Sequence, residues 1–269
     1  MQKRSVRWDE RAFVAEGAEL LRSALRAGVP IESVYVAPGG ADDALVAETL
    51  AQAEAAGVRV IPLASGVLER VSDTVTPQPV LTVLPMLDRG GAGGGAGGDG
   101  LSFEDAAEHP LIVVMVDVRD PGNAGTVLRT ADASGVSTVV FAGDSVDPYN
   151  PKTVRASAGS IFHVPFGVQQ DLAAVVSALS SAGYRTVATT VRSGLEYTAY
   201  DWSQPTALFL GNEASGLTEA EQALVGDAVA IPMEGQAESL NVGVACAVLC
   251  FEALRQRRAG VAGSGSDGI

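Results

Sequence analysis

Three polar loops in this chain contain residues that could bind and orient a small molecule. The first loop contains Asn123 and Arg129, the second contains Glu213, and the third contains Ser239 and Asn241. Each loop follows an apolar run typical of a buried strand, and ligands of open α/β sheets bind where such strands end. Glycines in these loops permit close approach of the backbone to a ligand. These residue types suit the binding of an uncharged heterocycle and a zwitterion by backbone groups.

Each of these polar residues also has a purely structural interpretation. Asn123, Ser239 and Asn241 are good helix N-cap residues. Arg129 either pairs with Asp132, three residues along the same helix, or points into a site. Glu213 either serves a helix N-terminus or lines a crevice at the end of its strand. Residue chemistry alone leaves these alternatives open.

Several common catalytic designs do not fit the residues present. The sequence has no Gly-Lys-Ser/Thr phosphate loop, no Gly-x-Ser-x-Gly elbow and only two histidines. Cys246 and Cys250 have no further cysteine or histidine at ligand spacing, so we predict reduced core thiols and no metal site. Residues 90–100 contain a G-x-G-x-x-A pattern, but no helix opens there, and the composition indicates a flexible linker.

The charge balance restricts how this protein can meet a nucleic acid. Its 269 residues include 32 acidic and 18 basic side chains, which gives a net charge of −14. This charge argues against binding of nucleic acid through bulk electrostatics, so any such contact must use a local basic surface. No apolar run reaches the roughly 18–20 residues of a membrane span, and the N-terminus lacks the apolar segment of a signal peptide. We expect a cytoplasmic protein that does not engage membranes.

The apolar patterns predict an α/β protein of two domains. Residues 1–88 are predicted to form a small α/β domain, and residues 89–108 a flexible glycine-rich linker. Residues 109–260 are predicted to form an α/β domain with a parallel sheet, because their strands are continuously apolar. Residues 261–269 are predicted to be a disordered tail.

Helical and alternating apolar patterns place the individual elements. In the first domain the predicted helices are 13–27, 42–56 and 66–71, and the predicted strands are 31–36, 58–62 and 79–87. In the second domain the predicted strands are 111–116, 138–142, 161–164, 185–190, 207–210 and 228–231. The predicted helices there are 123–134, 151–157, 171–182, 219–225 and 239–257. The last helix is apolar on nearly every side, so we expect it to be buried against a sheet, a partner subunit or both.

Taken together, the three loops resemble the three motifs of the SpoU-type (TrmH-like) RNA ribose 2′-O-methyltransferases of the SPOUT superfamily. The matching stretches are 120–132, 210–217 and 231–242, in the family's order and spacing. Residues 151–159 resemble the segment that the family places between its first two motifs. A weaker resemblance at 13–21 is to the family's small RNA-binding domain, which is itself similar to a ribosomal protein.

This resemblance implies a fold and partners that composition does not. It implies a SPOUT fold that binds S-adenosylmethionine, with a C-terminal segment threaded as a trefoil knot. General folding rules would not predict the knot, because knots are nearly absent from proteins. It also implies a homodimer with the final helix in the interface.

The resemblance assigns roles by position in the motifs. The residues expected to contact the cofactor or line its pocket are Gly211, Asn212, Ile231, Met233, Ser239 and Leu240. The residues expected to act in catalysis are Asn123, Arg129, Glu213, Ser239 and Asn241, with Arg129 central. Apart from these assignments by motif, we expect Arg129, Lys152 and Arg155 to contact RNA, together with Arg4, Arg7 and Arg11 of the first domain. The alternative for those last three is that they are solvated surface arginines.

The expected reaction is methyl transfer from S-adenosylmethionine to a ribose 2′-hydroxyl of structured RNA, with ribosomal RNA favoured. A guanidinium stays protonated, so Arg129 is expected to clamp an RNA phosphate rather than act as a simple base. Three alternatives are a transfer RNA 2′-O-methyltransferase, a catalytically silent RNA-binding protein on the same scaffold, and a nucleotide-dependent enzyme of doubly wound type. The last lacks its glycine fingerprint.

Overall fold

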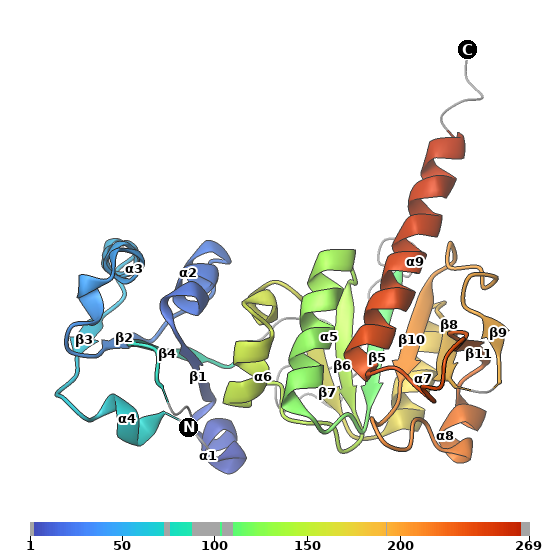
Figure 1. The fold of residues 1–269 in the computed structure, drawn as a ribbon, viewed down its shortest axis with the longest axis horizontal. Helices are drawn as coiled ribbons and strands as arrows, with labels where there is room; N and C mark the ends of the chain where they lie inside the picture. Colours follow the sequence, from blue (N-terminus) through green and yellow to red (C-terminus); the bar gives the residue numbers. More distant parts are fainter. Residues whose placement is uncertain (1–2, 73–75, 88–102, 104–109, 192, 265–269) are drawn as a thin grey trace. The chain divides into compact units, whose positions relative to one another are not determined.

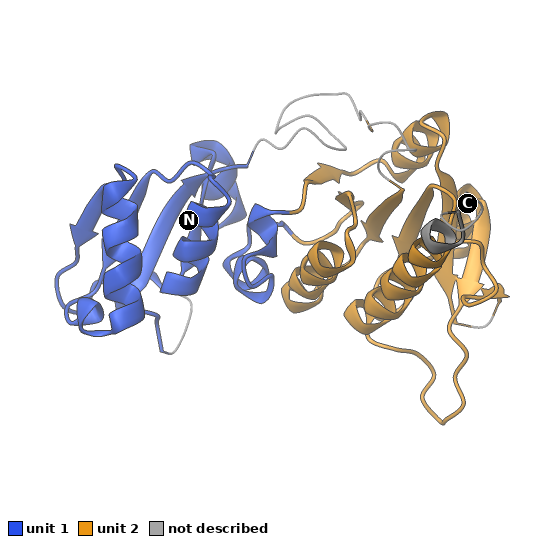
Figure 2. Cartoon of the chain, turned by 90° about the horizontal axis from the view of Figure 1, so that it is seen from above, with its two compact units in different colours: residues 1–87, 147–163 blue, residues 88–146, 164–269 orange. Residues whose placement is uncertain are grey.

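The computed structural model describes residues 3–72, 76–87, 103, 110–191 and 193–264, and Figure 1 labels its helices and strands. The chain forms two compact units (Figure 2). The first unit joins Met1–Leu87 with Asp147–His163, and the second joins Asp88–Val146 with Val164–Ile269. The glycine-rich linker predicted at 89–108 lies outside the described residues, apart from Phe103.

The first unit contains a four-stranded sheet in the order β1-β4-β2-β3. Its strands are β1 (Ala12–Glu16), β4 (Val80–Pro85), β2 (Ser33–Val36) and β3 (Val60–Pro62). Strand β4 is antiparallel to both neighbours, whereas β2 and β3 are parallel. Its helices are α1 (Arg4–Glu10), α2 (Ala18–Arg26), α3 (Ala44–Ala55) and α4 (Leu68–Val71), with a 3-10 turn, η1, at Gly40–Asp42. Leu21, Leu50 and Val80 belong to the apolar cluster between the sheet and its helices.

The predicted helix at 13–27 is wrong in its first part. Residues Ala12–Glu16 form β1, and α2 begins only after Gly17, whose φ of 107° is a conformation that few other residues adopt. Phe13 and Val14 fit a helical pattern with the leucines of α2, but the edge of β4 offers Ala12–Glu16 a full antiparallel register. Strand pairing with a distant segment therefore decides the conformation here.

Residues 147–163 pack with the first unit although they lie far along the chain. They contain α6 (Pro151–Ala156) and the 3-10 turn η2 (Ser160–Phe162), and α6 packs on β1. The strand predicted at 161–164 is wrong, since Ile161 and Phe162 lie in η2 and the next strand is β7 (Phe166–Gln169). A short buried apolar run does not by itself distinguish a strand from a helical turn.

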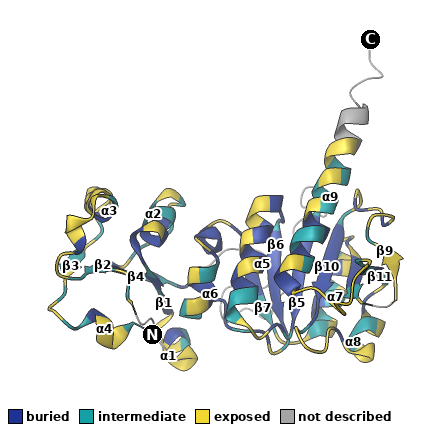
Figure 3. Cartoon of the chain, in the orientation of Figure 1, coloured by how far each residue is buried: buried dark blue, intermediate teal, exposed yellow. Residues whose placement is uncertain are grey.

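The second unit contains a fully parallel seven-stranded sheet in the order β7-β6-β5-β10-β8-β11-β9. Its further strands are β5 (Leu111–Val116), β6 (Thr138–Ala142), β8 (Arg185–Thr190), β9 (Leu195–Glu196), β10 (Thr206–Leu210) and β11 (Asp227–Ala230). Every residue of β5, β6 and β10 is buried, as Figure 3 shows for the middle of this sheet. Continuous apolar strands are what a sheet covered on both faces requires.

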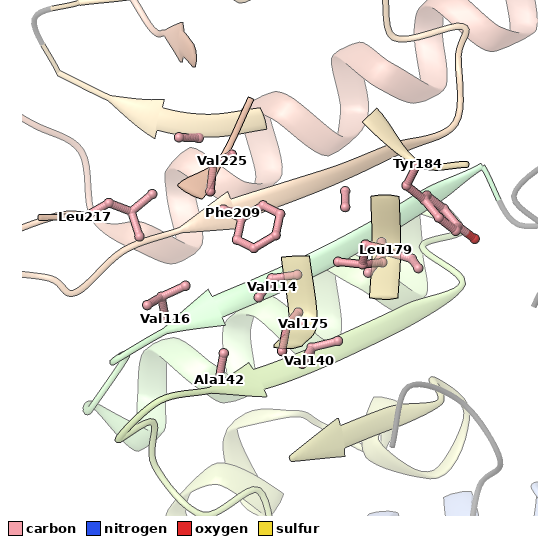
Figure 4. Packing of buried hydrophobic residues seen from close by; sticks show 13 residues of the cluster. Val114, Val116, Val140, Ala142, Val175, Leu179, Tyr184, Phe209, Leu217 and Val225 are labelled. Atoms are coloured by element: carbon pink, nitrogen blue, oxygen red, sulfur yellow. The ribbon is translucent and has the colours of Figure 1, made fainter. Parts of the chain in front are cut away.

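Helices cover both faces of this sheet (Figure 2). On one face, Val175 and Leu179 of α7 (Leu172–Ser181) pack in a cluster with Val114, Val140 and Phe209 (Figure 4). On the other face, α5 (Pro121–Ser134) and α9 (Val242–Ser264) pack against each other. A short helix, α8 (Glu219–Leu224), precedes β11 and begins with a capping box.

The final helix is buried on one side and exposed on the other. It begins at Val242 rather than at the predicted Ser239, and it continues to Ser264, so residues 261–264 are helical rather than part of a tail. Cys246 and Cys250 are free, buried thiols, as predicted. Val244 and Phe251 are each 48% exposed, so this chain alone leaves an apolar strip of α9 uncovered. Among the described residues, no helix is long and apolar enough to cross a membrane.

Candidate active site

The three polar loops meet at one edge of the parallel sheet. The first loop follows β5, the second follows β10, and the third joins β11 to α9. Because all strands run in the same direction, their carboxyl ends lie along one edge, and β5 and β10 are direct neighbours. The next two strands after β5, which are β6 and β7, lie on one side of it, and the later strands, including its neighbour β10, lie on the other side. Such a reversal creates a crevice where ligands of open α/β sheets bind.

Glu213 connects the second loop to the first. Its Oε1 accepts hydrogen bonds from Asn123 Nδ2 at 3.0 Å and from the Asp120 backbone N–H at 3.0 Å, and its Oε2 accepts one from the Arg119 backbone N–H at 3.3 Å. Burial disfavours the charged carboxylate of Glu213, but the hydrogen bonds from Asn123 and the backbone outweigh that effect and lower its pKa. Glu213 is therefore an ionised acceptor at neutral pH and a weak base.

Asn241 connects the third loop to the first. Its Nδ2 donates to Asn123 Oδ1 at 2.8 Å, and its Oδ1 accepts from the Gly243 backbone N–H at 2.9 Å. Asn123 donates through its amide nitrogen to Glu213 and accepts through its amide oxygen from Asn241, so the directions of the hydrogen bonds agree. Three polar side chains from three loops thus form one network.

The network resolves two of the structural alternatives. Asn123 is not the N-cap of α5, because Asp120 has that role and accepts from the Asn123 backbone N–H at 2.9 Å. Asn241 both caps a helix and joins the network. Its Oδ1 accepts from the first N–H groups of α9, and its Nδ2 donates to Asn123. Its carboxamide is therefore held at both ends.

A pocket of about 400 Å³ lies beside this network. Its lining includes all six residues predicted to hold the cofactor, namely Gly211, Asn212, Ile231, Met233, Ser239 and Leu240, and also Glu213. Leu210, Val229 and Leu249 add apolar surface. The pocket thus combines apolar side chains with polar groups that could orient a small molecule.

The second loop folds back tightly around Gly211. A Cβ atom on Gly211 would lie 2.3 Å from the carbonyl carbon of Gly216 and 2.3 Å from the backbone nitrogen of Leu217. Asn212 closes the same loop by accepting from the Ala214 N–H at 2.9 Å, and its Nδ2 donates to the Asp117 carbonyl at 2.8 Å. The pocket wall therefore depends on a glycine at 211 and on the amide of Asn212.

Arg129 does not join this network. It lies on α5, six residues after Asn123, and its side chain is exposed. Within the described part of the chain it forms no ion pair, so the alternative of a pair with Asp132 is not realised. An exposed guanidinium is available to bind an anion from outside the chain.

The predicted RNA-binding residues of the first unit divide into two groups. Lys152 and Arg155 are exposed on α6, and Arg4 and Arg11 are exposed at the two ends of α1. Arg7 is different, because it is only 2% exposed and ion-paired to Asp147. The expectation that Arg7 contacts RNA is therefore wrong, and the reason is a tertiary partner 140 residues away.

Sequence reasoning missed part of the pocket wall. Thr189, Thr190, Val191 and Ser193 follow or end β8 and line the pocket, as does Glu238 of the third loop. The carboxyl end of the predicted strand at 185–190 was the available signal. It was overlooked because the loop after this strand matches none of the three motifs.

Comparisons with known proteins agree with this geometry. Residues 110–251 match the SpoU rRNA Methylase family, and residues 1–82 match the MRM3-like substrate binding domain. The 23S rRNA (guanosine(2553)-2′-O)-methyltransferase RlmP of Bacillus subtilis is 31% identical over 239 residues, which covers 89% of this chain and 87% of that protein.

Two solved structures with bound cofactor are also similar. The SpoU methyltransferase AviRb from Streptomyces viridochromogenes in complex with AdoMet has a TM-score of 0.81 at 29% identity, covering 96% of this chain and 94% of that chain. The AdoMet-bound rRNA methyltransferase from Sinorhizobium meliloti has a TM-score of 0.76 at 30% identity, covering 94% and 91%.

The chain belongs to the SpoU rRNA methylase family. It is an S-adenosylmethionine-dependent RNA ribose 2′-O-methyltransferase with a SPOUT α/β fold, which confirms the predicted fold class, reaction and cofactor. The trefoil knot stays a prediction.

The residues of the pocket fit this cofactor. Apolar side chains such as Ile231 and Leu240 suit an uncharged heterocycle, and the tight loop at Gly211 presents backbone groups to it. When bound, S-adenosylmethionine supplies a methyl group on a positively charged sulfur, and Glu213 and Glu238 are carboxylates among the lining residues. Within the described residues, no group of three or more histidine, cysteine or acidic side chains could hold a metal ion.

Proposed function

We propose that this enzyme methylates the ribose of one nucleotide in ribosomal RNA. The observation that carries the proposal is similarity over both units, since the RlmP relative, named for 23S rRNA, aligns with 89% of the chain. Two solved structures named for transfer RNA modification cover only 57% and 56% of it, with TM-scores of 0.50 and 0.52. A substrate-binding unit in the first 87 residues favours a large folded RNA over transfer RNA. Action on ribosomes also supports a cytoplasmic protein.

The proposed catalytic roles follow from what each side chain can donate or accept. A 2′-hydroxyl is a weak nucleophile until its proton is drawn away, and correct orientation supplies much of the rate. The exposed guanidinium of Arg129 clamps the adjacent RNA phosphate, which orients the hydroxyl and helps to accept its proton through the phosphate. Glu213 has a lowered pKa and three donors, so it holds Asn123 instead of acting as the base.

Asn123, Ser239 and Asn241 are proposed to hold the target ribose next to the cofactor pocket. Asn241 is fixed through both ends of its amide, which keeps the third loop beside the first. A ribose that enters there meets polar groups whose geometry is set before binding. Such preorganisation lowers the cost of reaching the transition state.

We also propose that two copies of the chain pair through α9. Val244 and Phe251 are seven residues apart, which is two helical turns, so they lie on one side of the helix. Each is 48% exposed, whereas Cys246 and Leu249 on the opposite side are buried. A second copy would cover this apolar strip, and symmetric pairing of the same surface is the commonest way to form a homodimer.

Methyl transfer to defined RNAs tests the proposed substrate. Labelled S-adenosylmethionine would be incubated with the protein and with in-vitro-transcribed 23S rRNA, 16S rRNA or a transfer RNA pool. We expect label in ribosomal RNA at a single nucleotide, mapped by 2′-O-methyl-sensitive primer extension. Label in transfer RNA alone would assign the tRNA alternative.

A catalytically silent RNA-binding protein is the second candidate. It predicts binding of ribosomal RNA without any transfer of label. The intact hydrogen bonds of Asn123, Glu213 and Asn241 argue against it, since a silent protein has no need to keep them.

A further inference from the structure

A buried ion pair in the first unit has no part in the chemistry described so far. The side chains of Arg7 and Asp147 are only 2% and 4% exposed, and Arg7 Nε donates to Asp147 Oδ2 at 3.0 Å. Arg7 Nη2 donates to the same oxygen, and Asp147 Oδ1 accepts from the Tyr149 backbone N–H at 3.1 Å. Charges removed from water are retained only where each has partners, so this pair marks a specific junction between α1 and residues 147–163.

Aromatic packing continues the same junction. The ring of Tyr149 lies 4.8 Å from that of Phe13 in β1 and 6.3 Å from that of Trp8 in α1, measured between centroids. The Tyr149 hydroxyl donates to the Leu87 carbonyl at 3.2 Å and accepts from the Leu87 N–H at 3.0 Å. Residues 147–163 are thus bound along α1, β1 and the end of the first 87 residues.

A close contact fixes the far end of the same segment. A Cβ atom on Gly159 would lie 2.4 Å from Ser23 Oγ of α2, and Gly159 has a φ of 97°. Residues 147–163 therefore meet the first 87 residues at both ends, at Asp147 and at Gly159. This leaves α6 between two fixed points, with Val154 buried and the helix packed on β1.

The charge of this segment is unusual for so acidic a protein. Residues 148–163 contain no aspartate or glutamate, whereas the whole chain has a net charge of −14. The acid next to them, Asp147, is buried and paired with Arg7. Lys152 and Arg155 are exposed one turn apart on α6, so the charged side chains that α6 itself exposes are both basic.

We propose that residues 3–87 and 147–163 act as one RNA-binding body in which the Arg7–Asp147 pair holds α6. In that body Lys152 and Arg155 contact RNA phosphates, and Arg7 and Asp147 are positioning residues that never touch RNA. The inference rests on the proposed ribosomal RNA substrate. It also explains how an acidic chain offers RNA a local basic surface, since phosphate contacts dominate such binding.

Asp147→Asn gives the sharpest test, because charge counting and the proposal predict opposite results. The change removes one negative charge, which on charge alone should strengthen RNA binding. The proposal predicts about 10-fold weaker binding of labelled, in-vitro-transcribed 23S rRNA in a filter assay, because Arg7 would be buried without its partner and α6 would loosen. Asp9→Asn, an exposed acid on α1, is the matched control and should bind at least as well as the unmodified protein.

A double-mutant cycle shows whether the effect passes through α6. K152A/R155A should weaken binding about 10-fold and reduce the salt slope by roughly 1.5, as expected for two lost phosphate contacts. Adding Asp147→Asn to that variant should cause no further loss. If the triple variant instead loses the product of the two separate fold-losses in binding, the proposal is overturned, because Asp147 would then act independently of Lys152 and Arg155.

A rescue variant separates positioning from misfolding and from direct contact by Arg7. R7M/D147N leaves no unpaired buried charge and keeps an acceptor for the Tyr149 N–H, so its binding should return to within about twofold of the unmodified protein. Continued weak binding by R7M/D147N would overturn the positioning role. Affinity for S-adenosylmethionine should stay unchanged in every variant, since its pocket lies in the second unit. If the unmodified protein fails to bind 23S rRNA, the proposed substrate is wrong as well. If it binds normally but the losses from Asp147→Asn and K152A/R155A multiply independently, only the present inference is refuted.

Discussion

The carboxamide of Asn241 donates a hydrogen bond of 2.8 Å to the carboxamide oxygen of Asn123, 118 residues earlier in the chain. This bond joins the loop that begins α9 to the loop that begins α5. The same two helices pack closely, and a Cβ atom on Gly243 would lie 2.7 Å from Thr126 Cγ2. The polar network is therefore held in place by the helix pair behind it.

Replacement of Asn241 by aspartate should separate catalysis from stability. Aspartate keeps an acceptor for the Gly243 N–H, so the start of α9 stays capped, but it has no donor for Asn123. We expect methyl transfer to fall about 100-fold with little change in the free energy of unfolding. Asn241→Ala should lose activity and also about 1 kcal/mol of stability, because it removes the cap as well. Single-turnover transfer and urea unfolding measure the two effects, and equal stability of the two variants would contradict this division.

Loss of the Arg129 guanidinium should abolish transfer and spare everything else. Its exposed side chain has no hydrogen-bond or ion-pair partner among the described residues, so Arg129→Ala should change the free energy of unfolding by no more than about 0.5 kcal/mol. The transfer rate should fall about 100- to 1,000-fold, and calorimetry should find unchanged affinity for S-adenosylmethionine. Arg59→Ala, an exposed arginine of the first unit, is the control. Near-normal turnover of the Arg129 variant would refute the clamp.

A methyl group on Gly211 should destroy the cofactor pocket. The new Cβ atom would lie 2.3 Å from backbone atoms of Gly216 and Leu217, which cannot move without opening the loop. We expect Gly211→Ala to lose S-adenosylmethionine binding by at least about 10-fold in calorimetry. Gly235→Ala is the matched control, because its Cβ atom would have no neighbour within 4 Å. Similar affinities of the two variants would show that the loop does not shape the pocket.

Acid should weaken the fold through Glu213, and the sign follows from its lowered pKa. The carboxylate form accepts the hydrogen bonds from Asn123, Asp120 and Arg119, so its contribution is fully present above the ordinary glutamate pKa of about 4.3. That contribution is lost as the pH falls through the lowered pKa of Glu213. Thermal unfolding between pH 3 and pH 7 should show a steeper acid limb for the unmodified protein than for Glu213→Gln. If stability falls equally steeply with acid in both proteins, the Glu213 carboxylate does not accept these hydrogen bonds in solution.

A charge on the exposed side of α9 should separate the proposed homodimer. Phe251→Glu places a carboxylate on the apolar strip of Val244 and Phe251, where pairing would press it against apolar side chains. Sedimentation velocity should then find a monomer, whereas the unmodified chain should sediment as a dimer. Leu224→Glu is the control, since Leu224 is 46% exposed on α8, away from this helix. A dimer that persists in the Phe251 variant would require a different interface.

Local sequence patterns predict the secondary structure correctly where burial alone decides the conformation. The continuously apolar runs at 111–116 and 138–142 predict β5 and β6 with their observed bounds, because a strand buried on both faces allows no other composition. Where distant segments compete, the patterns failed. Residues 12–16 became a strand because β4 pairs with them, and residues 160–162 became a 3-10 turn packed in the first unit.

The sequence by itself determined the reaction, because the residues of the three motifs and their order along the chain define the family. The resemblance of these motifs also predicts Gly211, Ile231 and Leu240 in one pocket, and all three line it. Only the tertiary structure decided that Asn123 joins Glu213 and Asn241 in one network while Asp120 caps the helix, and that Arg7 is buried. Those outcomes depend on hydrogen bonds between residues 90 to 140 positions apart, and no local pattern encodes which distant groups a folded chain brings within 3 Å.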